Sequence, residues 1–164
     1  MGPRNLTRLV FTRQDADVIR QHGARDYPSE CCGILLGRAD GGRKEVLEVV
    51  PLTNLRHDPE RAQALLPLEE PGRECERNRF LIDPRDQLRV EKEARARGLE
   101  VLGYYHSHPD SPARPSNYDL DHAWPWYSYV ILAFWKGDPG EITSWVLAED
   151  RSRFDPEPIE IASR

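Results

Sequence analysis

Four side chains able to bind or activate a metal ion lie close together in the sequence: His106, His108, Ser116 and Asp119. Side chains alternate along an extended strand, so His106 and His108 would point to the same side and both imidazoles can reach one ion. The chain between His108 and Asp119 is long enough to turn back and add a carboxylate oxygen. Two nitrogens and one oxygen leave one position of a tetrahedral zinc ion open, which is typical of a catalytic site rather than a structural one.

The residues between these side chains fit such a geometry. Pro109 has no N–H for a sheet ladder, so the strand should end there, and the prolines of residues 111–115 predict a loop. Ser116 followed by Asp119 predicts a helix start with a capping box. A second interpretation therefore exists, in which Ser116 and Asp119 only cap a helix and the two histidines lie at the surface. The pairing with an upstream His-x-His-Pro favours the metal site.

The series His106-Ser107-His108-Pro109, Ser116 and Asp119 resembles the signature of the JAMM (MPN+) zinc metalloproteases, in particular their compact prokaryotic members. The resemblance continues upstream at residues 29–37, where Glu30 precedes two cysteines, and downstream through residues 119–120 and 127–134. It covers roughly residues 6–147. It implies a single MPN (JAB)-like α/β domain, with a central mixed β-sheet flanked by helices and a cytidine-deaminase-like architecture.

The same resemblance implies a role for each residue of the site. His106, His108 and Asp119 would hold one Zn²⁺ per chain, Glu30 would be the general base and acid, and Ser116 would hydrogen-bond the oxyanion. None of the five departs from the family pattern, so the inactive scaffold members of this fold, which lack ligands, are a poor match. Glu30 owes its role to the resemblance alone, because without it the residue would be taken for a surface glutamate ahead of a strand.

The elements that must position these residues alternate between strands and helices, as in an α/β domain. Thr12 predicts the cap of a first helix that ends near Gly23, and Asp83-Pro84 predicts the start of a helix that stops at Gly98. A short helix over 117–124 follows the ligand loop. Strands are predicted over 33–37 and 44–53 as a hairpin, over 99–106, and over 127–135 and 142–147 around a turn at 136–140, with an edge strand over 159–162.

Residues 54–77 interrupt this pattern with Pro, Glu and Arg. Both flanks belong to core elements, so we predict an irregular excursion within one domain spanning 1–164 rather than a linker between two domains. Loops of this length are often functional or mobile, and this one is predicted either to wall a substrate groove or to be disordered.

Composition narrows the class of protein. The 164 residues suit one domain, and 38% apolar residues with four tryptophans indicate a packed core. A net charge of −5 without a Lys/Arg run argues against nucleic acid as a partner. No stretch is predicted to cross a membrane or to serve as a secretory signal. Three cysteines make a poor disulfide framework, so we expect a cytoplasmic protein.

The leading hypothesis is a zinc-dependent peptidase or isopeptidase. The resemblance points to the C-terminal tail of a ubiquitin-like sulfur-carrier protein as substrate, and we expect an extended tail to pair with an exposed sheet edge beside the metal. One alternative is a zinc deaminase, but the chain lacks the Cys-x-x-Cys of that signature. Another is a non-catalytic scaffold or partner-binding module with a structural metal.

The remaining candidate residues receive simpler interpretations. Cys31 and Cys32 are expected to be buried and inert rather than nucleophiles. His122 would share a helix face with Asp119 but is expected to be an ordinary helix residue, and His22 and His57 have no constellation around them. The aromatic run 124–129 is expected to form sheet core and rim, with substrate lining as the alternative.

Overall fold

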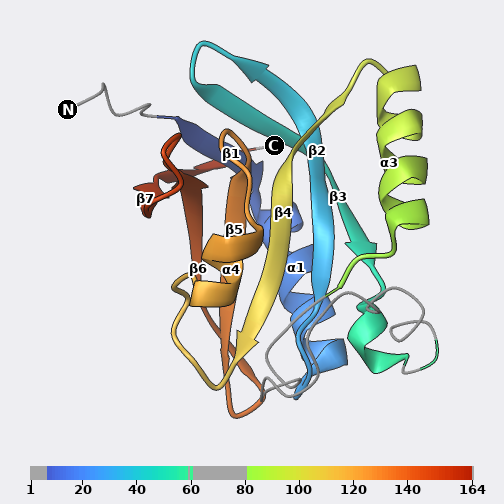
Figure 1. The fold of residues 1–164 in the computed structure, drawn as a ribbon, viewed down its shortest axis with the longest axis vertical. Coiled ribbons are helices and arrows are strands. Elements are labelled where there is room, and N and C mark those ends of the chain that lie inside the picture. Colours follow the sequence, from blue (N-terminus) through green and yellow to red (C-terminus); the bar gives the residue numbers. More distant parts are fainter. Residues whose placement is uncertain (1–6, 59, 61–80, 164) are drawn as a thin grey trace.

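The computed structural model describes residues 7–58, 60 and 81–163. These residues form one eight-stranded sheet with helices on both of its faces (Figure 1). In chain order the elements are β1 (Arg8–Thr12), α1 (Arg13–Asp26), β2 (Cys32–Asp40), β3 (Arg43–Leu52), η1 (Leu55–His57), α3 (Pro84–Ala96), β4 (Glu100–Pro109), α4 (Asn117–His122), β5 (Ser128–Trp135), β6 (Asp138–Leu147), β7 (Phe154–Glu157) and β8 (Ile159–Ala162).

The sheet is mixed, as predicted. Its strand order is β7-β6-β5-β4-β2-β3-β1-β8, with parallel pairs β4–β5, β1–β3 and β1–β8 and antiparallel pairs elsewhere. The strand that carries both histidines, β4, therefore lies in the interior of the sheet between β2 and β5. Among the described strands β7 and β8 lie at the two outer edges of the sheet.

The two faces of the sheet bury different helices, because successive strand residues point to opposite sides. Leu35 of β2 packs with Ile19 of α1 in one buried cluster, whereas its neighbour Ile34 packs with Val90 of α3 in another. Tyr104 joins the α3 cluster to one that includes Leu120 of α4. Helix α1 thus covers one face, and α3 and α4 cover the other.

Helix α1 begins as predicted and ends later. Thr12 and Asp15 form a reciprocal capping box, each side chain accepting from the other's backbone N–H at 3.1 and 2.9 Å. The helix does not stop near Gly23 but continues to Asp26. A Cβ on Gly23 would meet the side chains of Leu132 and Phe134 at 3.0–3.2 Å. The glycine therefore serves close packing of the helix on the sheet, not termination.

Most other predicted elements are present with small shifts. The β2–β3 hairpin is antiparallel, α3 is capped by Asp83 with Pro84 in its first turn, and Gly98 has φ +70° just past its end. Helix α4 ends at His122, two residues short of the prediction. The prediction was wrong at the β5–β6 turn, which contains only Lys136 and Gly137, both with positive φ, so β6 begins at Asp138.

Two short strands, β1 and β7, were not predicted. The edge strand β8 is present and pairs in parallel with β1. Of the predicted 54–77 excursion, residues 54–58 and 60 are described and include the single turn η1, while residues 59 and 61–77 lie outside the described residues. The excursion and the 1–164 domain limits remain predictions. No helix in the described part of the chain combines the length and the apolar character needed to cross a membrane.

Candidate metal centre

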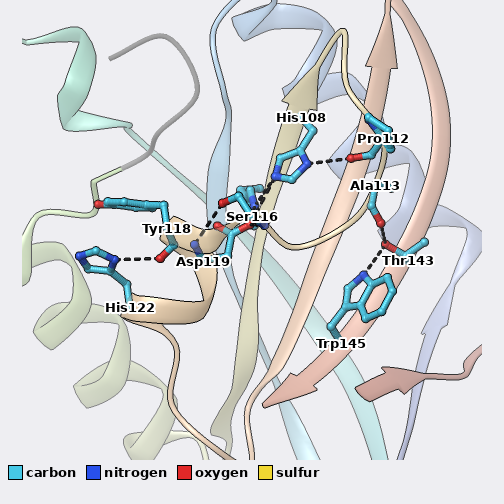
Figure 2. A network of polar contacts seen from close by, with 10 residues as sticks. His108, Pro112, Ala113, Ser116, Tyr118, Asp119, His122, Thr143 and Trp145 are labelled. Carbon is cyan, nitrogen blue, oxygen red and sulfur yellow. Dashed lines mark hydrogen bonds and ion pairs between the residues drawn. The ribbon is translucent and has the colours of Figure 1, made fainter. Parts of the chain in front are cut away.

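The two histidines of β4 face each other at the C-terminal end of the strand. Their Nε2 atoms lie 3.0 Å apart, and both side chains are buried or nearly so. His108 is oriented from behind, because its Nδ1 lies 2.9 Å from the carbonyl oxygen of Pro112 (Figure 2). An Nδ1–H donated to that carbonyl leaves the Nε2 lone pair of His108 pointing at His106.

Helix α4 brings the third group. Asp119 Oδ2 lies 3.4 Å from His106 Nε2 and 3.5 Å from His108 Nε2. The carboxylate is held there by the capping box of α4: Asp119 Oδ2 accepts from the Ser116 N–H at 2.8 Å, and Ser116 Oγ accepts from the Asp119 N–H at 3.1 Å (Figure 2). The capping interpretation and the metal interpretation of these two residues therefore hold together.

The three atoms are spaced as ligands of one small cation. Ligand atoms bound to a tetrahedral zinc ion at its usual bond lengths lie about 3.4 Å from one another, and the observed separations are 3.0, 3.4 and 3.5 Å. Imidazole Nε2 atoms that are not protonated and a carboxylate oxygen are all acceptors, so without a cation or added protons they would repel each other. The residues present thus fit a zinc ion.

The surroundings also favour the ionised carboxylate. Burial would raise the pKa of Asp119, but imidazoles that carry a proton on Nε2, together with the Ser116 amide, stabilise its charged form more strongly. The net result is a pKa well below the usual range for aspartate. Asp119 is therefore charged at neutral pH, which is the form in which a carboxylate can bind a metal ion.

Glu30 comes from a distant part of the chain. Cys32 pairs with His106 across β2 and β4, Ser107 N donates to the Cys31 carbonyl at 3.1 Å, and Cys31 N donates to Ser107 Oγ at 2.8 Å. This register brings a Glu30 oxygen within 4.8 Å of the ligand atoms of both histidines. Glu30 is 1% exposed, so the simple prediction of a surface glutamate is wrong and the family expectation of proximity is met.

Distance alone would allow Glu30 as a metal ligand in a Glu30–His106–His108 set. Asp119 is the candidate with the shorter contacts, because its oxygen lies within 3.5 Å of both Nε2 atoms. The Glu30 carboxylate lies beside the same two histidines.

The loop after β4 is rigidly anchored. The Ala113 carbonyl accepts from Thr143 Oγ1 at 2.6 Å, which in turn accepts from Trp145 Nε1 at 2.8 Å (Figure 2). Asp110 accepts from the Lys136 N–H and the Tyr27 hydroxyl, each at 2.7 Å. Beside the loop lies a cavity of about 240 Å³ lined by His108, Ser111, Pro112, Arg114 and Ser116.

Several other candidates take no part in the site. Cys31 and Cys32 are fully buried free thiols, and burial raises the pKa of Cys31 to about 12 and that of Cys32 as well, so neither is a reactive thiolate. The His122 ring stacks on Tyr118 and its Nδ1 bonds the Tyr118 carbonyl. Of the aromatic run, Tyr129 is core but Trp124 is exposed at the surface.

Sequence reasoning missed two positioning features. Asn54 donates to the Glu30 carbonyl at 3.0 Å and accepts from the Leu81 N–H at 2.9 Å, which ties the segment that carries Glu30 to the residues just before α3. His22 is buried between Tyr105, whose hydroxyl is 2.7 Å from its Nδ1, and Asp26, 3.3 Å from its Nε2. The i, i+4 spacing of His22 and Asp26 on one helix was a signal for the second feature.

Comparison with known proteins gives a family match across most of the chain. Residues 12–148 match the family described as prokaryotic homologs of the JAB domain. Two solved structures have a related fold. One, a solution structure from Desulfitobacterium hafniense, is 31% identical with a TM-score of 0.73 and covers 95% of this chain and 94% of the other. The other, a JAB1/MPN domain protein from Archaeoglobus fulgidus, has a TM-score of 0.51 at 16% identity, covering 96% and 97%.

Three curated relatives are named as proteases or by the conjugates they cleave. A desampylase from Haloferax volcanii is 31% identical, covering 77% of this chain and 81% of the relative. A probable TtuB-protein conjugate cleaving protease from Thermus thermophilus is 34% identical, covering 76% and 69%. A CysO-cysteine peptidase from Mycobacterium tuberculosis is 26% identical, covering 76% and 73%.

Proposed function

Because this chain belongs to the family of prokaryotic homologs of the JAB domain, we propose that it is a zinc-dependent peptidase or isopeptidase. His106, His108 and Asp119 would hold the ion. The observation that supports this most is the convergence of their three acceptor atoms within 3.5 Å of one another, with Glu30 buried beside them. Relatives named as peptidases and desampylases support a hydrolase.

A zinc ion in this site would act as a Lewis acid toward the substrate carbonyl and lower the pKa of water. Hydrolysis also needs a group that takes a proton from the attacking water and gives it to the leaving amine. Glu30 is suited to this task, because it is buried beside the ligands and its backbone is held by Asn54 and by the pairing of Cys31 with Ser107.

Ser116 is suited to stabilise the developing oxyanion. Its Oγ accepts from the Asp119 N–H, and a hydroxyl that accepts one bond still has its proton to donate. The side chain also lines the cavity beside His108. Capping and oxyanion stabilisation are therefore compatible roles for one hydroxyl.

For the substrate we propose the C-terminal tail of a ubiquitin-like sulfur-carrier protein, as the names of the relatives suggest. The expected pairing of the tail with a sheet edge stays a prediction, in which the tail would lie beside the end of β4. We propose that the tail approaches over the loop that follows β4. Among the described residues Cys31 and Cys32 are free thiols, which suits the cytoplasm as the compartment.

The test uses the full chain loaded with zinc and ubiquitin-like carriers that end in Gly-Gly, extended either by one residue or by an isopeptide bond to a lysine. Mass spectrometry should show loss of the extension from at least one of them. EDTA should stop the reaction and added zinc should restore it. Unchanged masses across all carriers, or full activity without metal, would contradict the proposal.

A further inference from the structure

The cavity beside the metal centre contains a positive charge that the site described so far does not use. Arg114 lines it together with Ser111, Pro112, Ser116 and His108. The residue is exposed, and within residues 7–58, 60 and 81–163 its guanidinium forms no ion pair. An arginine that lines the same cavity as His108 and Ser116 offers five donors in a planar fork.

The backbone that carries Arg114 is held in place from both sides. Pro112 and Pro115, whose own φ angles are fixed by their rings, flank the Ala113–Arg114 pair. Arg114 N donates to the Pro112 carbonyl at 2.8 Å. That carbonyl is also the partner of His108 Nδ1, and the neighbouring Ala113 is buried and bonded to Thr143. The backbone of Arg114 is thus held at a fixed place relative to His108, and its side chain lines the cavity from there.

The size of the cavity limits what can enter it. At about 240 Å³ it is smaller than the roughly 300–1,000 Å³ of pockets that hold drug-sized ligands. One or two residues of an extended chain fit such a space, and each spans at most about 3.6 Å. A terminal carboxylate one residue past a bond cleaved beside His108 would therefore reach the cavity that Arg114 lines.

We propose that Arg114 binds the terminal α-carboxylate of a short extension on the leaving side of the cleaved bond. This inference rests on the proposed function and specifies its substrate: a carrier tail followed by one or two residues with a free carboxylate. An isopeptide-linked lysine within a protein has no carboxylate at that place. In the reaction water adds its hydroxyl to the carbonyl carbon, the C–N bond breaks, and the proton goes to the leaving amine.

The first experiment measures hydrolysis by the zinc-loaded full chain. Two semisynthetic carriers both end in Gly-Gly-Ala, one with a free carboxylate and one with a carboxamide. A charge-assisted bidentate contact predicts that the acid is cut about 10-fold faster in kcat/KM than the amide. Arg114→Gln should remove this preference and Arg114→Lys should restore part of it. The control Arg95→Gln, an exposed arginine of α3, should keep the preference.

The second experiment measures binding and needs no turnover. The same two carriers are titrated by calorimetry into zinc-loaded Glu30→Gln protein, with and without Arg114→Gln. A preference for the acid that depends on Arg114 supports the inference even if no carrier is hydrolysed, in which case only the proposed function fails. Hydrolysis or binding without a preference for the acid overturns the inference and leaves the proposed function standing. An equal loss on both carriers in Arg114→Gln also overturns it.

Discussion

Two groupings of histidine with aspartate lie on opposite faces of the same strand. On the α1 face, Tyr105 of β4 meets His22, which meets Asp26. On the α4 face, the next residue, His106, meets His108 and Asp119. The two groupings contain nearly the same residue types, but only the second has the geometry of a metal site.

The difference lies in how donors and acceptors are arranged. Around His22 they alternate: an Nε2–H can donate to Asp26 while the Tyr105 hydroxyl donates to Nδ1. Around His106 and His108 the carboxylate and the imidazole lone pairs converge instead, an arrangement that a cation or extra protons would satisfy. A buried histidine therefore indicates a metal site only when its neighbours lack donors.

Removing one of the converging acceptors should have the largest effect. His108→Ala leaves only His106 and Asp119 of the three proposed ligands, and we expect loss of both bound zinc and hydrolysis, measured by metal analysis and carrier cleavage. His22→Gln on the other face should keep zinc at one ion per chain while lowering the melting temperature. Equal loss of zinc in the two variants would break the distinction between the groupings.

Glu30→Gln keeps the size and position of the side chain but removes its ability to accept a proton. We expect zinc content to stay near one per chain and hydrolysis to fall about 10²–10⁴-fold, the usual contribution of a general base. If the variant keeps full turnover, Glu30 is not the base. Retained zinc without turnover would also count against a scaffold in which the metal is only structural.

The sequence was sufficient for the alternation of His106 and His108 and for the capping box of Ser116 and Asp119, because both depend on residues within one turn or strand. It could not bring Glu30 to the site, since that depends on the register of β2 against β4. Gly33 shows why such register is not readable: it lies opposite Tyr105, and a Cβ there would come within 2.5 Å of the tyrosine ring. Gly23 was predicted as a helix end because its close contacts, Leu132 and Phe134, come from a strand that is distant in the sequence.

Ser116→Ala tests whether one hydroxyl serves both capping and catalysis. Loss of an oxyanion donor predicts a fall of about 10²–10³ in kcat, and loss of the cap costs about 1 kcal/mol of stability. The matched control is Thr12→Ala, which removes the equivalent hydroxyl from the capping box of α1. It should cost similar stability in chemical denaturation without slowing hydrolysis. Equal activities of the two variants would show that Ser116 is only a cap.

Tyr105→Phe tests the α1 face alone. The variant deprives His22 of its hydroxyl partner in a fully buried place, so we expect a loss of about 1 kcal/mol in the free energy of unfolding. Zinc affinity should be unaffected despite the adjacent His106. Weaker zinc binding would mean that the two faces of β4 are coupled.

The pH dependence of stability also tests the grouping around His22, and its expected effect is the smallest of these predictions. Burial lowers the pKa of His22, an effect that Asp26 partly offsets and Arg25 reinforces. The unfolded chain therefore takes up the proton first as pH falls below about 6.5, so the contribution of neutral His22 is present above that pH and is lost below it. In EDTA, wild type should lose more stability than His22→Gln between pH 7 and pH 5 in urea titrations. Parallel curves would contradict this.

The strict alternation along β4 has an evolutionary consequence. A one-residue insertion or deletion within the strand would turn the imidazoles of His106 and His108 toward α1 and aim Tyr105 and Ser107 at the opposite side. Such length changes would abolish the enzyme in one step even where the fold tolerated them. Natural variation in length is therefore expected to accumulate in other segments, while the number of residues in β4 stays constant.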